Sequence, residues 1–228
     1  VLDYRPIQKG ASTYGEKWLD GAIEPDGRVY TSWKQMGAKT SRMSSSNPNL
    51  QNIPVRREKV YRYCFIAADG NVLVVGDWAA QEPRNTAFLS QDDELIDIFK
   101  SGGDPYIKVG FEIFNEKFTK KDNRRKDMKA LVLGLSYGMT KYGLKNKLDE
   151  FTPEISHTLE YAQELIDAFF AAFPGVENYI NENRKKASKL GYVETIWDRR
   201  LYISPYDPRL DTEAPNYSIQ GSAGESMK

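Results

Sequence analysis

Hydrophobic and polar positions along the chain predict strands near its beginning and near its end. Residues 27–33 and 60–77 are rich in β-branched and aromatic residues, which is typical of strands. An Asp-Gly-Asn sequence at 69–71 divides the second segment and predicts a hairpin turn. The run from 72 to 75 is continuously apolar, as in a strand that is buried on both faces. Residues 191–203 return to strand-like alternation around a turn.

The segment between these strands has helical periodicity. Ser90, followed three residues later by Asp93, indicates a capping box at the start of a helix. Thr152 and Pro153 predict a second start, with threonine as N-cap and proline at the first helical position. The run that follows ends at Pro174-Gly175, since proline and glycine interrupt helices. Its apolar residues keep a helical spacing and predict a core face; they are Leu159, Leu165, Ile166, Phe169, Phe170 and Phe173.

This order of elements predicts an α+β fold in which one sheet carries a helical subdomain. The final strands, with a turn near Asp198, would return to that sheet. A length of 228 residues suits one or two domains and allows a substantial core.

Composition narrows the chemistry. The 32 basic and 32 acidic residues balance, so phosphate binding would depend on local clusters and not on a basic excess. Cys64 is the only cysteine, which excludes an intramolecular disulfide and favours a reducing compartment. His157 is the only histidine, which argues against a His-built zinc site or a Ser-His-Asp triad, and we expect both residues to be structural. No apolar run reaches membrane length, and a first residue of Val1 suggests a piece of a longer product.

Asp77 ends the apolar run VLVVGD. A carboxylate at the end of a strand can hold a hard divalent cation, although an aspartate in this place is more often a turn or cap residue. Glu82 and Arg84 follow at five and seven residues, and by themselves they could form a solvated ion pair.

Four residues recur at every fourth position of a helical segment: Arg125, Lys129, Leu133 and Tyr137. At about 100° per residue they cover only about 120° of a helix, so they predict a single stripe. Two cations followed by an apolar residue and a tyrosine suit a nucleotide, because the cations meet the phosphates. The alternative is a solvated basic face. Gly134 and Gly138 suggest close packing or close approach of a ligand.

A loop early in the chain, SRMSSSNPNLQNIP, is dense in neutral donors and acceptors. Such groups contact sugar-phosphate backbones and minor-groove base edges. A polar surface loop with a turn at Asn47-Pro48 is the alternative. Its candidate contact residues are Arg42, Asn49, Gln51 and Asn52.

Taken together, these segments resemble the motifs of family A DNA polymerases. Residues 40–54, TSRMSSSNPNLQNIP, are similar to the TGRLSSSDPNLQNIP signature of that family. Asp77, Glu82 and Arg84 match its motif A, D-x-x-x-x-E-x-R. Motif B, R-x-x-x-K-x-x-x-[FY]-G-x-x-Y-G, is matched by Arg125, Lys129, Gly134, Tyr137 and Gly138. GYVETIWDRR and NYSIQGSAGESMK resemble later segments, so the resemblance extends from about residue 20 to the end.

The resemblance implies a role for each matching residue. Asp77 would hold two catalytic magnesium ions, with the Trp78 carbonyl nearby. Arg125 and Lys129 would bind the triphosphate of an incoming deoxynucleotide and assist catalysis. Tyr137 would lie under the nascent base pair.

The resemblance also implies contacts with the sugar and with DNA. Glu82 would exclude a ribose 2′-OH. The minor groove of a primer–template would be contacted by Arg42, Asn49, Gln51, Asn52 and Gln220.

Three residues depart from the family pattern. Leu133 replaces an aromatic residue, so stacking against the sugar would be lost. Tyr106 stands where a phosphate-contacting histidine is common, and Pro83 replaces an aliphatic residue of motif A. These departures concern substrate discrimination.

The implied architecture is an incomplete right-hand polymerase, with an antiparallel palm sheet enclosing helical fingers. The palm would comprise residues 1–85 and, after fingers at 86–190, residues 191–228. Motif C, with the second metal-binding aspartate, would follow Lys228. We therefore expect the chain to be inactive alone, unless a second chain supplies motif C and the thumb.

Three alternatives remain open from the sequence. The chain could be half of a split polymerase, a non-catalytic DNA-binding remnant, or part of a single-subunit RNA polymerase, against which Glu82 argues. The resemblance further implies DNA replication or repair in the bacterial cytoplasm, by a bacterial or phage protein, without a membrane partner.

Overall fold

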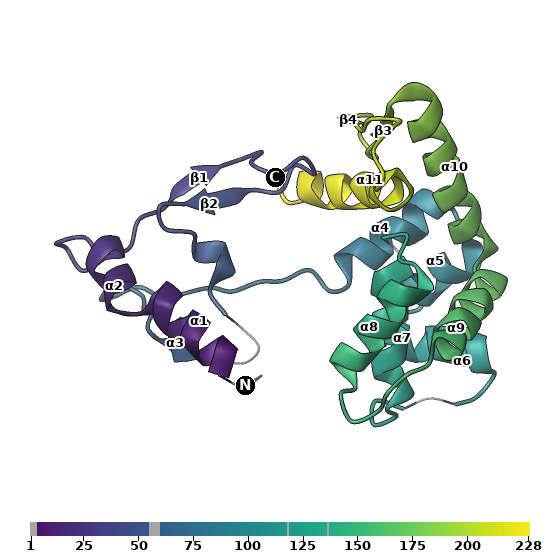
Figure 1. The fold of residues 1–228 in the computed structure, drawn as a ribbon, viewed down its shortest axis with the longest axis horizontal. Helices are drawn as coiled ribbons and strands as arrows, with labels where there is room; N and C mark the ends of the chain where they lie inside the picture. Colours follow the sequence, from purple (N-terminus) through teal and green to yellow (C-terminus); the bar gives the residue numbers. More distant parts are fainter. Residues whose placement is uncertain (1–3, 55–59, 118, 136) are drawn as a thin grey trace. The chain divides into compact units, whose positions relative to one another are not determined.

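The computed structural model describes residues 4–54, 60–117, 119–135 and 137–228. The chain divides into two units, Val1–Gly76 and Asp77–Lys228, whose elements are labelled in Figure 1. The described residues are mainly helical and contain two small antiparallel sheets. Within those ranges, none of the helices has the length and apolar character that crossing a membrane requires.

Short elements make up the first unit. β1 and β2 pair antiparallel, with Trp33 opposite Ser45. The strand predicted at 27–33 is displaced. The observed strand β1 begins at Ser32, so only the last two predicted residues belong to it. The elements are α1 (Tyr4–Tyr14), α2 (Glu16–Ala22), β1 (Ser32–Lys34), β2 (Ser44–Ser46), a 3-10 helix (Leu50–Asn52) and α3 (Val60–Tyr63).

The strands predicted across 60–77 do not form, and this prediction was wrong. α3 occupies the start of the segment, and residues 64–77 belong to no strand. The predicted turn does form, since the Asn71 N–H donates to the Ala68 carbonyl at 2.9 Å. Val74 and Val75 are each 91% exposed. A strand needs a neighbour to satisfy its backbone groups, and no strand of the described residues pairs with this run.

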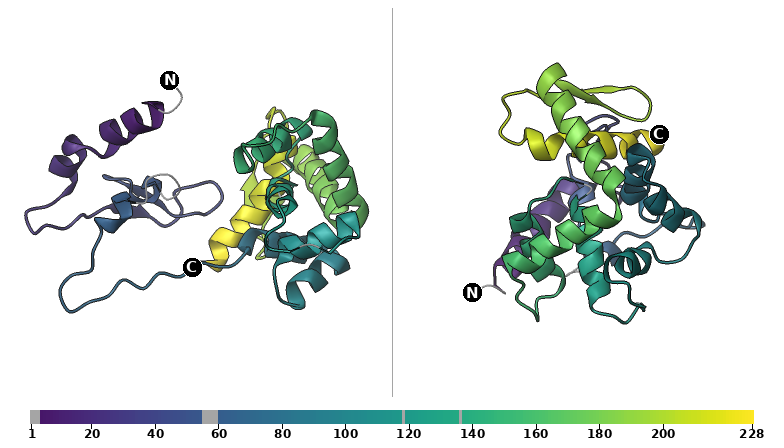
Figure 2. Two further views of the ribbon diagram at one scale, coloured as in Figure 1. Left: turned by 90° about the horizontal axis from the view of Figure 1, so that it is seen from below. Right: turned by 90° about the vertical axis from the view of Figure 1, so that its right-hand side faces the viewer.

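Eight helices and one hairpin are described in the second unit. Figure 2 shows the helices packed directly on one another. They are α4 (Gln81–Ser90), α5 (Asp93–Lys100), α6 (Pro105–Phe114), α7 (Arg124–Leu135), α8 (Lys141–Phe151), α9 (Leu159–Ala172), α10 (Pro174–Leu190) and α11 (Leu210–Ser226), with β3 (Tyr192–Glu194) and β4 (Arg200–Tyr202).

The sequence predicted Ser90 at the start of α5, but in the structure Asp92 is the N-cap of this helix. The Asp92 carboxylate accepts the Leu95 N–H at 3.0 Å, whereas Ser90 is the last residue of α4. The other carboxylate oxygen of Asp92 accepts the Gly175 N–H at 2.8 Å. One side chain therefore caps α5 and joins it to the start of α10.

The start of α9 also differs from the prediction. Its N-cap is Thr158, whose hydroxyl accepts the Tyr161 N–H at 3.1 Å. Thr152 instead ends α8. Pro153 follows directly, and a proline cannot continue the preceding helix.

The apolar face of α9 lies in the core as predicted. Leu165, Ile166, Phe169 and Phe173 are buried, and the rings of Phe169 and Phe173 lie 4.9 Å apart. This face packs with buried residues of α7 and α8, among them Leu131, Leu135, Leu144 and Leu148. The helix ends before Pro174, which begins α10.

The strands predicted at 191–203 are present as β3 and β4, with a turn in which Asp198 has a positive φ of 60°. Val193 and Leu201 lie opposite each other and are buried. They join Ala214 and Tyr217 of α11 in a second hydrophobic cluster. The hairpin is thus packed against α11.

Candidate nucleotide-binding site

The accessible positions of α7 follow the predicted stripe. Arg125, Lys129 and Leu133 are half-buried. The intervening positions from 127 to 135 are buried: Asp127, Met128, Ala130, Leu131, Val132, Gly134 and Leu135. The first turn of α7 is also accessible outside the stripe, since Lys126 is exposed and Arg124 is half-buried, but from 127 to 135 only Lys129 and Leu133 reach solvent. Tyr137, also half-buried, lies in the turn that follows α7, so the predicted helical stripe does not continue to this residue.

Arg125 is held by a carboxylate that the sequence analysis did not identify. Its Nε and Nη2 atoms lie 2.8 Å and 2.5 Å from Oδ2 of Asp104. Asp104 is also the N-cap of α6 and accepts the Tyr106 N–H at 3.1 Å. The Asp-Pro sequence at 104–105 is a recognisable helix start, but nothing local to it indicates an arginine 21 residues away.

Tyr106 lies beside the same arginine. The Arg125 guanidinium is 5.5 Å from the centre of the Tyr106 ring, within cation–π range. Burial, followed by the charge of Asp104, raises the pKa of the Tyr106 hydroxyl. The structure therefore brings Tyr106 and Arg125 together, and the tyrosine is a neutral hydrogen-bonding group.

Lys129 lies one turn further along α7. Its Nζ is 6.0 Å from the centre of the ring of Phe151, the last residue of α8. The aromatic face stabilises the ammonium group without neutralising it. The stripe thus combines a paired guanidinium with an ammonium group on a half-buried face.

Gly138 permits a close contact at the end of the stripe. Its φ is 64°, a conformation that favours glycine. A Cβ at this position would lie 3.2 Å from the Asp211 carbonyl oxygen and 3.2 Å from Cγ of Pro215. Of the two explanations given for this glycine, the structure shows close packing, here between the turn after α7 and α11.

The motif A residues lie at and before the start of α4. Glu82 is in its first turn and is half-buried. Arg84 donates from Nε to the Ala79 carbonyl at 3.0 Å, and its guanidinium lies 5.1 Å from the centre of the Phe99 ring.

One of the helices that pack against α4 is α11, which carries Gln220. That side chain is half-buried. A residue that the sequence analysis did not identify, Gln81, joins the two helices by donating from Nε2 to the Ala223 carbonyl at 3.1 Å.

Asp77 and Trp78 precede α4 and are exposed. Carboxylate and carbonyl oxygens are ligands that Mg²⁺ prefers, so their donor chemistry fits a magnesium ion. Within the described ranges, no group of three or more Asp, Glu, His or Cys side chains gathers to hold a metal. Two donors alone do not complete the coordination of a divalent cation.

The other candidate DNA-binding residues belong to the first unit, where Arg42, Asn49, Gln51 and Asn52 are exposed. Asn49 caps the 3-10 helix by accepting the Gln51 N–H at 3.0 Å. The Gln51 side chain donates to the Met43 carbonyl at 3.1 Å. Two of these polar side chains thus also maintain the conformation of their own loop.

A solved structure shows which class of protein has this fold. The fold matches the POL domain of Pol1 from M. smegmatis, solved in complex with a DNA primer-template and dNTP, with a TM-score of 0.82. The match is 30% identical and covers 99% of this chain and 40% of that one. The mainly helical arrangement with small antiparallel sheets is therefore that of a polymerase domain.

The chain belongs to DNA polymerase family A, whose model matches residues 1–228. It is 37% identical to DNA polymerase I of Chloroflexus aurantiacus over 237 residues and 34% identical to that of Pseudomonas aeruginosa over 238. Each match covers the whole chain but only 24% and 25% of the relative. The chain thus spans about a quarter of the length of these curated relatives.

Proposed function

We propose that the chain is the nucleotide- and DNA-binding part of a template-directed DNA polymerase. The observation that supports this best is the face of α7 on which Arg125 and Lys129 are accessible, while the positions from 127 to 135 other than Lys129 and Leu133 are buried. The reaction is transfer of a deoxynucleotide to a primer 3′-OH, in DNA replication or repair. In this proposal residues 1–85 and 191–228 belong to the palm and 86–190 to the fingers.

Arg125 and Lys129 bind the triphosphate. A guanidinium has five N–H donors, and Asp104 receives two of them. Three donors remain for phosphate oxygens, while the carboxylate fixes the plane of the group. Both donors bind the same oxygen, Oδ2, and two bonds from one planar group orient it in a way that a single ammonium contact does not.

The remaining nucleotide contacts are to the phosphate, the base pair and the sugar. Tyr106 reaches the phosphates beside Arg125, and Tyr137 supports the nascent base pair. Leu133, between Lys129 and Tyr137 on the stripe, packs on the sugar through apolar contact only. Glu82 excludes a 2′-OH by its bulk and charge, which selects deoxynucleotides.

Asp77, with the carbonyl of Trp78, is the place for magnesium, which family A polymerases use. Bound Mg²⁺ stabilises the charge that develops on the transferred phosphate and activates the primer 3′-OH. DNA contacts come from Arg42, Asn49, Gln51, Asn52 and Gln220, whose guanidinium and amide N–H groups can donate to minor-groove acceptors common to all base pairs.

The experiment is a titration of the purified chain with fluorescently labelled dATP. Lys129→Ala removes a charged contact to phosphate worth about 1.5–3 kcal/mol, so the affinity should fall about 10- to 150-fold. Lys126→Ala is the matched control, because Lys126 is an exposed lysine of the same helix. It should leave the affinity within about twofold.

Two results would contradict the proposal. If Lys129→Ala bound the nucleotide like the original chain, the stripe would not be the phosphate site. If both alanine variants lost affinity equally, the attraction would be general electrostatics and not a specific contact. Labelled primer–template DNA, titrated in parallel, should be bound about equally by both variants.

A further inference from the structure

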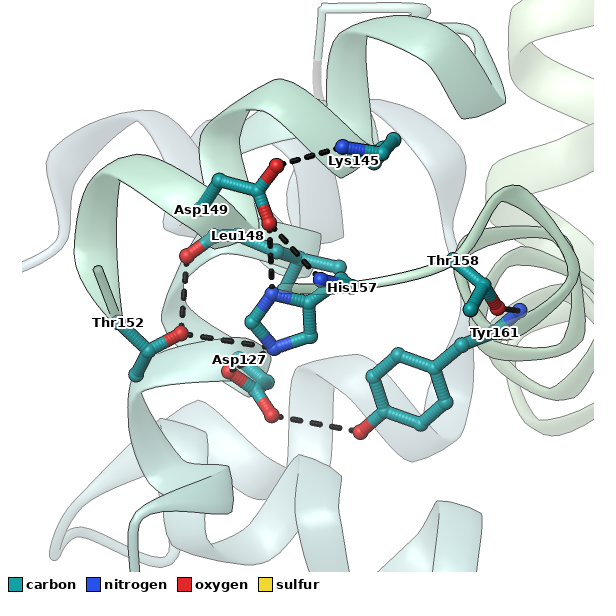
Figure 3. Close-up of polar contacts among 8 residues, drawn as sticks. All are labelled: Asp127, Lys145, Leu148, Asp149, Thr152, His157, Thr158 and Tyr161. Carbon is teal, nitrogen blue, oxygen red and sulfur yellow. Dashed lines mark hydrogen bonds and ion pairs between the residues drawn. The ribbon is translucent and has the colours of Figure 1, made fainter. Parts of the chain in front are cut away.

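His157, the only histidine of the chain, lies in a buried cluster of polar side chains that includes Asp127 of α7. His157 precedes α9 and is 7% exposed. Figure 3 shows its ring among side chains from three helices: Asp127 of α7, Asp149 of α8 and Tyr161 of α9. The ring of Tyr161 stacks on that of His157, with centroids 5.7 Å apart and an interplanar angle of 19°.

One side of the imidazole is bound to Asp149. Oδ1 of Asp149 accepts the backbone N–H of His157 at 3.0 Å and lies 3.0 Å from Nδ1 of the ring. Its other oxygen accepts from Lys145 at 2.6 Å. The bond from Lys145, followed by those from His157, holds the pKa of the Asp149 carboxyl well below its usual range. Asp149 is therefore an acceptor, and Nδ1 carries a proton.

The other side of the imidazole faces two more acceptors. Nε2 lies 3.5 Å from the Thr152 hydroxyl and 3.9 Å from Oδ1 of Asp127. The Thr152 hydroxyl already donates its proton to the Leu148 carbonyl at 2.9 Å, so only its lone pairs can face Nε2. The ring is therefore oriented with Nδ1 toward Asp149 and Nε2 toward Thr152 and Asp127.

Asp127 is the side chain of α7 that Nε2 of His157 faces. It is 6% exposed, and its Oδ2 accepts the Tyr161 hydroxyl at 3.3 Å. Its Oδ1 is buried and has no hydrogen-bond partner among the residues that the structure describes. Burial raises the pKa of the Asp127 carboxyl, and the nearby His157 opposes that shift. A buried carboxylate with an unsatisfied oxygen is costly, and Nε2 of His157, 3.9 Å away, is the polar atom that faces this oxygen.

Asp127 also lies opposite the stripe. It is two residues from Arg125 and two from Lys129, which corresponds to about 200° of rotation around the helix in either direction. A link at Asp127 therefore fixes the rotation of α7 and, with it, the direction in which both cations project.

We propose that His157 is a positioning residue for nucleotide binding, which acts through Asp127 to fix the rotation of α7 and so the placement of Arg125 and Lys129. This proposal rests on the nucleotide-binding role of α7 argued above. Asp149 and Thr152 orient the ring, and Tyr161 holds the second oxygen of Asp127.

Two conservative variants separate the two sides of the ring. In His157→Asn, the amide can take the place of Nδ1 and keep the bond to Asp149, but nothing faces Asp127. In His157→Gln, the longer amide can take the place of Nε2 and donate toward Asp127. The side-chain bond from position 157 to Asp149 is then lost, while the backbone N–H bond remains. The affinity for labelled dATP should fall about fivefold or more in His157→Asn and clearly less in His157→Gln.

Restoration tests the mechanism directly. Adding Asp127→Asn to His157→Asn removes the buried charge that needed compensation, so the double variant should regain most of the lost affinity. Hydrogen exchange of the α7 amides, measured without nucleotide, should be faster in His157→Asn and slower again in the double variant. Leu201→Ala, buried in the β3–β4 cluster, controls for general destabilisation and should leave both readouts unchanged.

The outcomes distinguish the two proposals. If Lys129→Ala also bound nucleotide normally, the nucleotide role of α7 and the positioning proposal would both fail. If Lys129→Ala lost affinity but His157→Asn did not, only the positioning role would be wrong. A larger loss in His157→Gln than in His157→Asn would overturn it too, since the bond to Asp149 would then be the one that matters.

Discussion

The two units bury apolar side chains to very different extents. Among the described residues of the first unit, the buried hydrophobic side chains are Ala22 and Ile53. In the second unit, a single hydrophobic cluster contains buried residues from every helix from α4 through α11, including Phe169, Phe173 and Ile219. Burial of apolar surface is the dominant favourable contribution to folding. The candidate nucleotide-binding stripe of α7 therefore lies on a packed scaffold, whereas the candidate DNA-binding loop does not.

The loop of the first unit is held in another way. The Ser45 hydroxyl is buried and lies 2.8 Å from that of Thr31 and 3.2 Å from the Pro48 carbonyl. It also accepts the Leu50 N–H at 2.9 Å. A single hydroxyl thus connects β2 with the segment before β1 and with the 3-10 helix. The same chain thus fixes one candidate surface by packing of apolar side chains and another by hydrogen bonds.

The largest expected effect tests the packed side of this comparison. Phe169→Ala should reduce the free energy of unfolding of the second unit by about 3–5 kcal/mol, because it opens a cavity in the core. Tyr63→Ala removes an aromatic ring that is 75% exposed in the first unit, and it should change stability by about 0.5 kcal/mol or less. Urea unfolding followed by peptide-resolved hydrogen exchange measures both. Equal losses would mean that the first unit has a core of its own.

The next effect tests the hydrogen-bonded side. Ser45→Ala removes the acceptor of the Leu50 N–H, whereas Thr31 and Pro48 keep their mutual bond, and it should destabilise the loop locally by about 1–3 kcal/mol. Exchange should become faster across residues 43–52 and stay unchanged in α9. Ser46→Ala is the matched control, since Ser46 is the adjacent residue of β2 and points to the other face. If the two serine variants behaved alike, the buried hydroxyl would not be the connection described here.

Local periodicity explains what the sequence predicted correctly. The stripe of α7, the core face of α9 and the β3–β4 hairpin depend on spacing within about fifteen residues, and the structure has all three. A helix satisfies its own backbone bonds, so its pattern needs no distant partner. The family resemblance likewise depends on motifs in order, and the match over the whole chain confirms it.

Contacts between distant residues explain what the sequence could not predict. The run from 72 to 75 has the composition of a strand but pairs with no strand of the described residues. Asp92 and not Ser90 caps α5, and its second carboxylate oxygen binds Gly175, which is 83 residues away and cannot be read from the local sequence. Asp104 and Arg125 are 21 residues apart, so no helical spacing relates them. Each of these outcomes depends on tertiary contacts that local propensity does not encode.

The smallest effect compares one carboxylate from each unit. In the first unit, bonds from the Tyr30 hydroxyl and then the Arg28 N–H lower the pKa of Asp26. In the second, bonds from Lys145 and then His157 lower the pKa of Asp149. A lowered carboxyl pKa means that the unfolded chain binds the proton more readily. The stabilisation is therefore complete well above the ordinary value of 3.8, starts to decline as the pH approaches that value, and is lost as the pH falls through the lowered pKa of the folded chain.

Neutralising either carboxylate should make its own unit less sensitive to acid. Asp149→Asn should be less stable than the original chain at pH 7, and the difference should shrink between about pH 5 and pH 3. The hydrogen exchange of α8 and α9, measured across that range, reports this change. Asp26→Asn should produce the corresponding change only in the residues around the turn that it caps. If Asp26→Asn altered the acid sensitivity of α8 as strongly as Asp149→Asn does, the two units would unfold together, and the contrast between a packed and a hydrogen-bonded unit would not describe their stabilities.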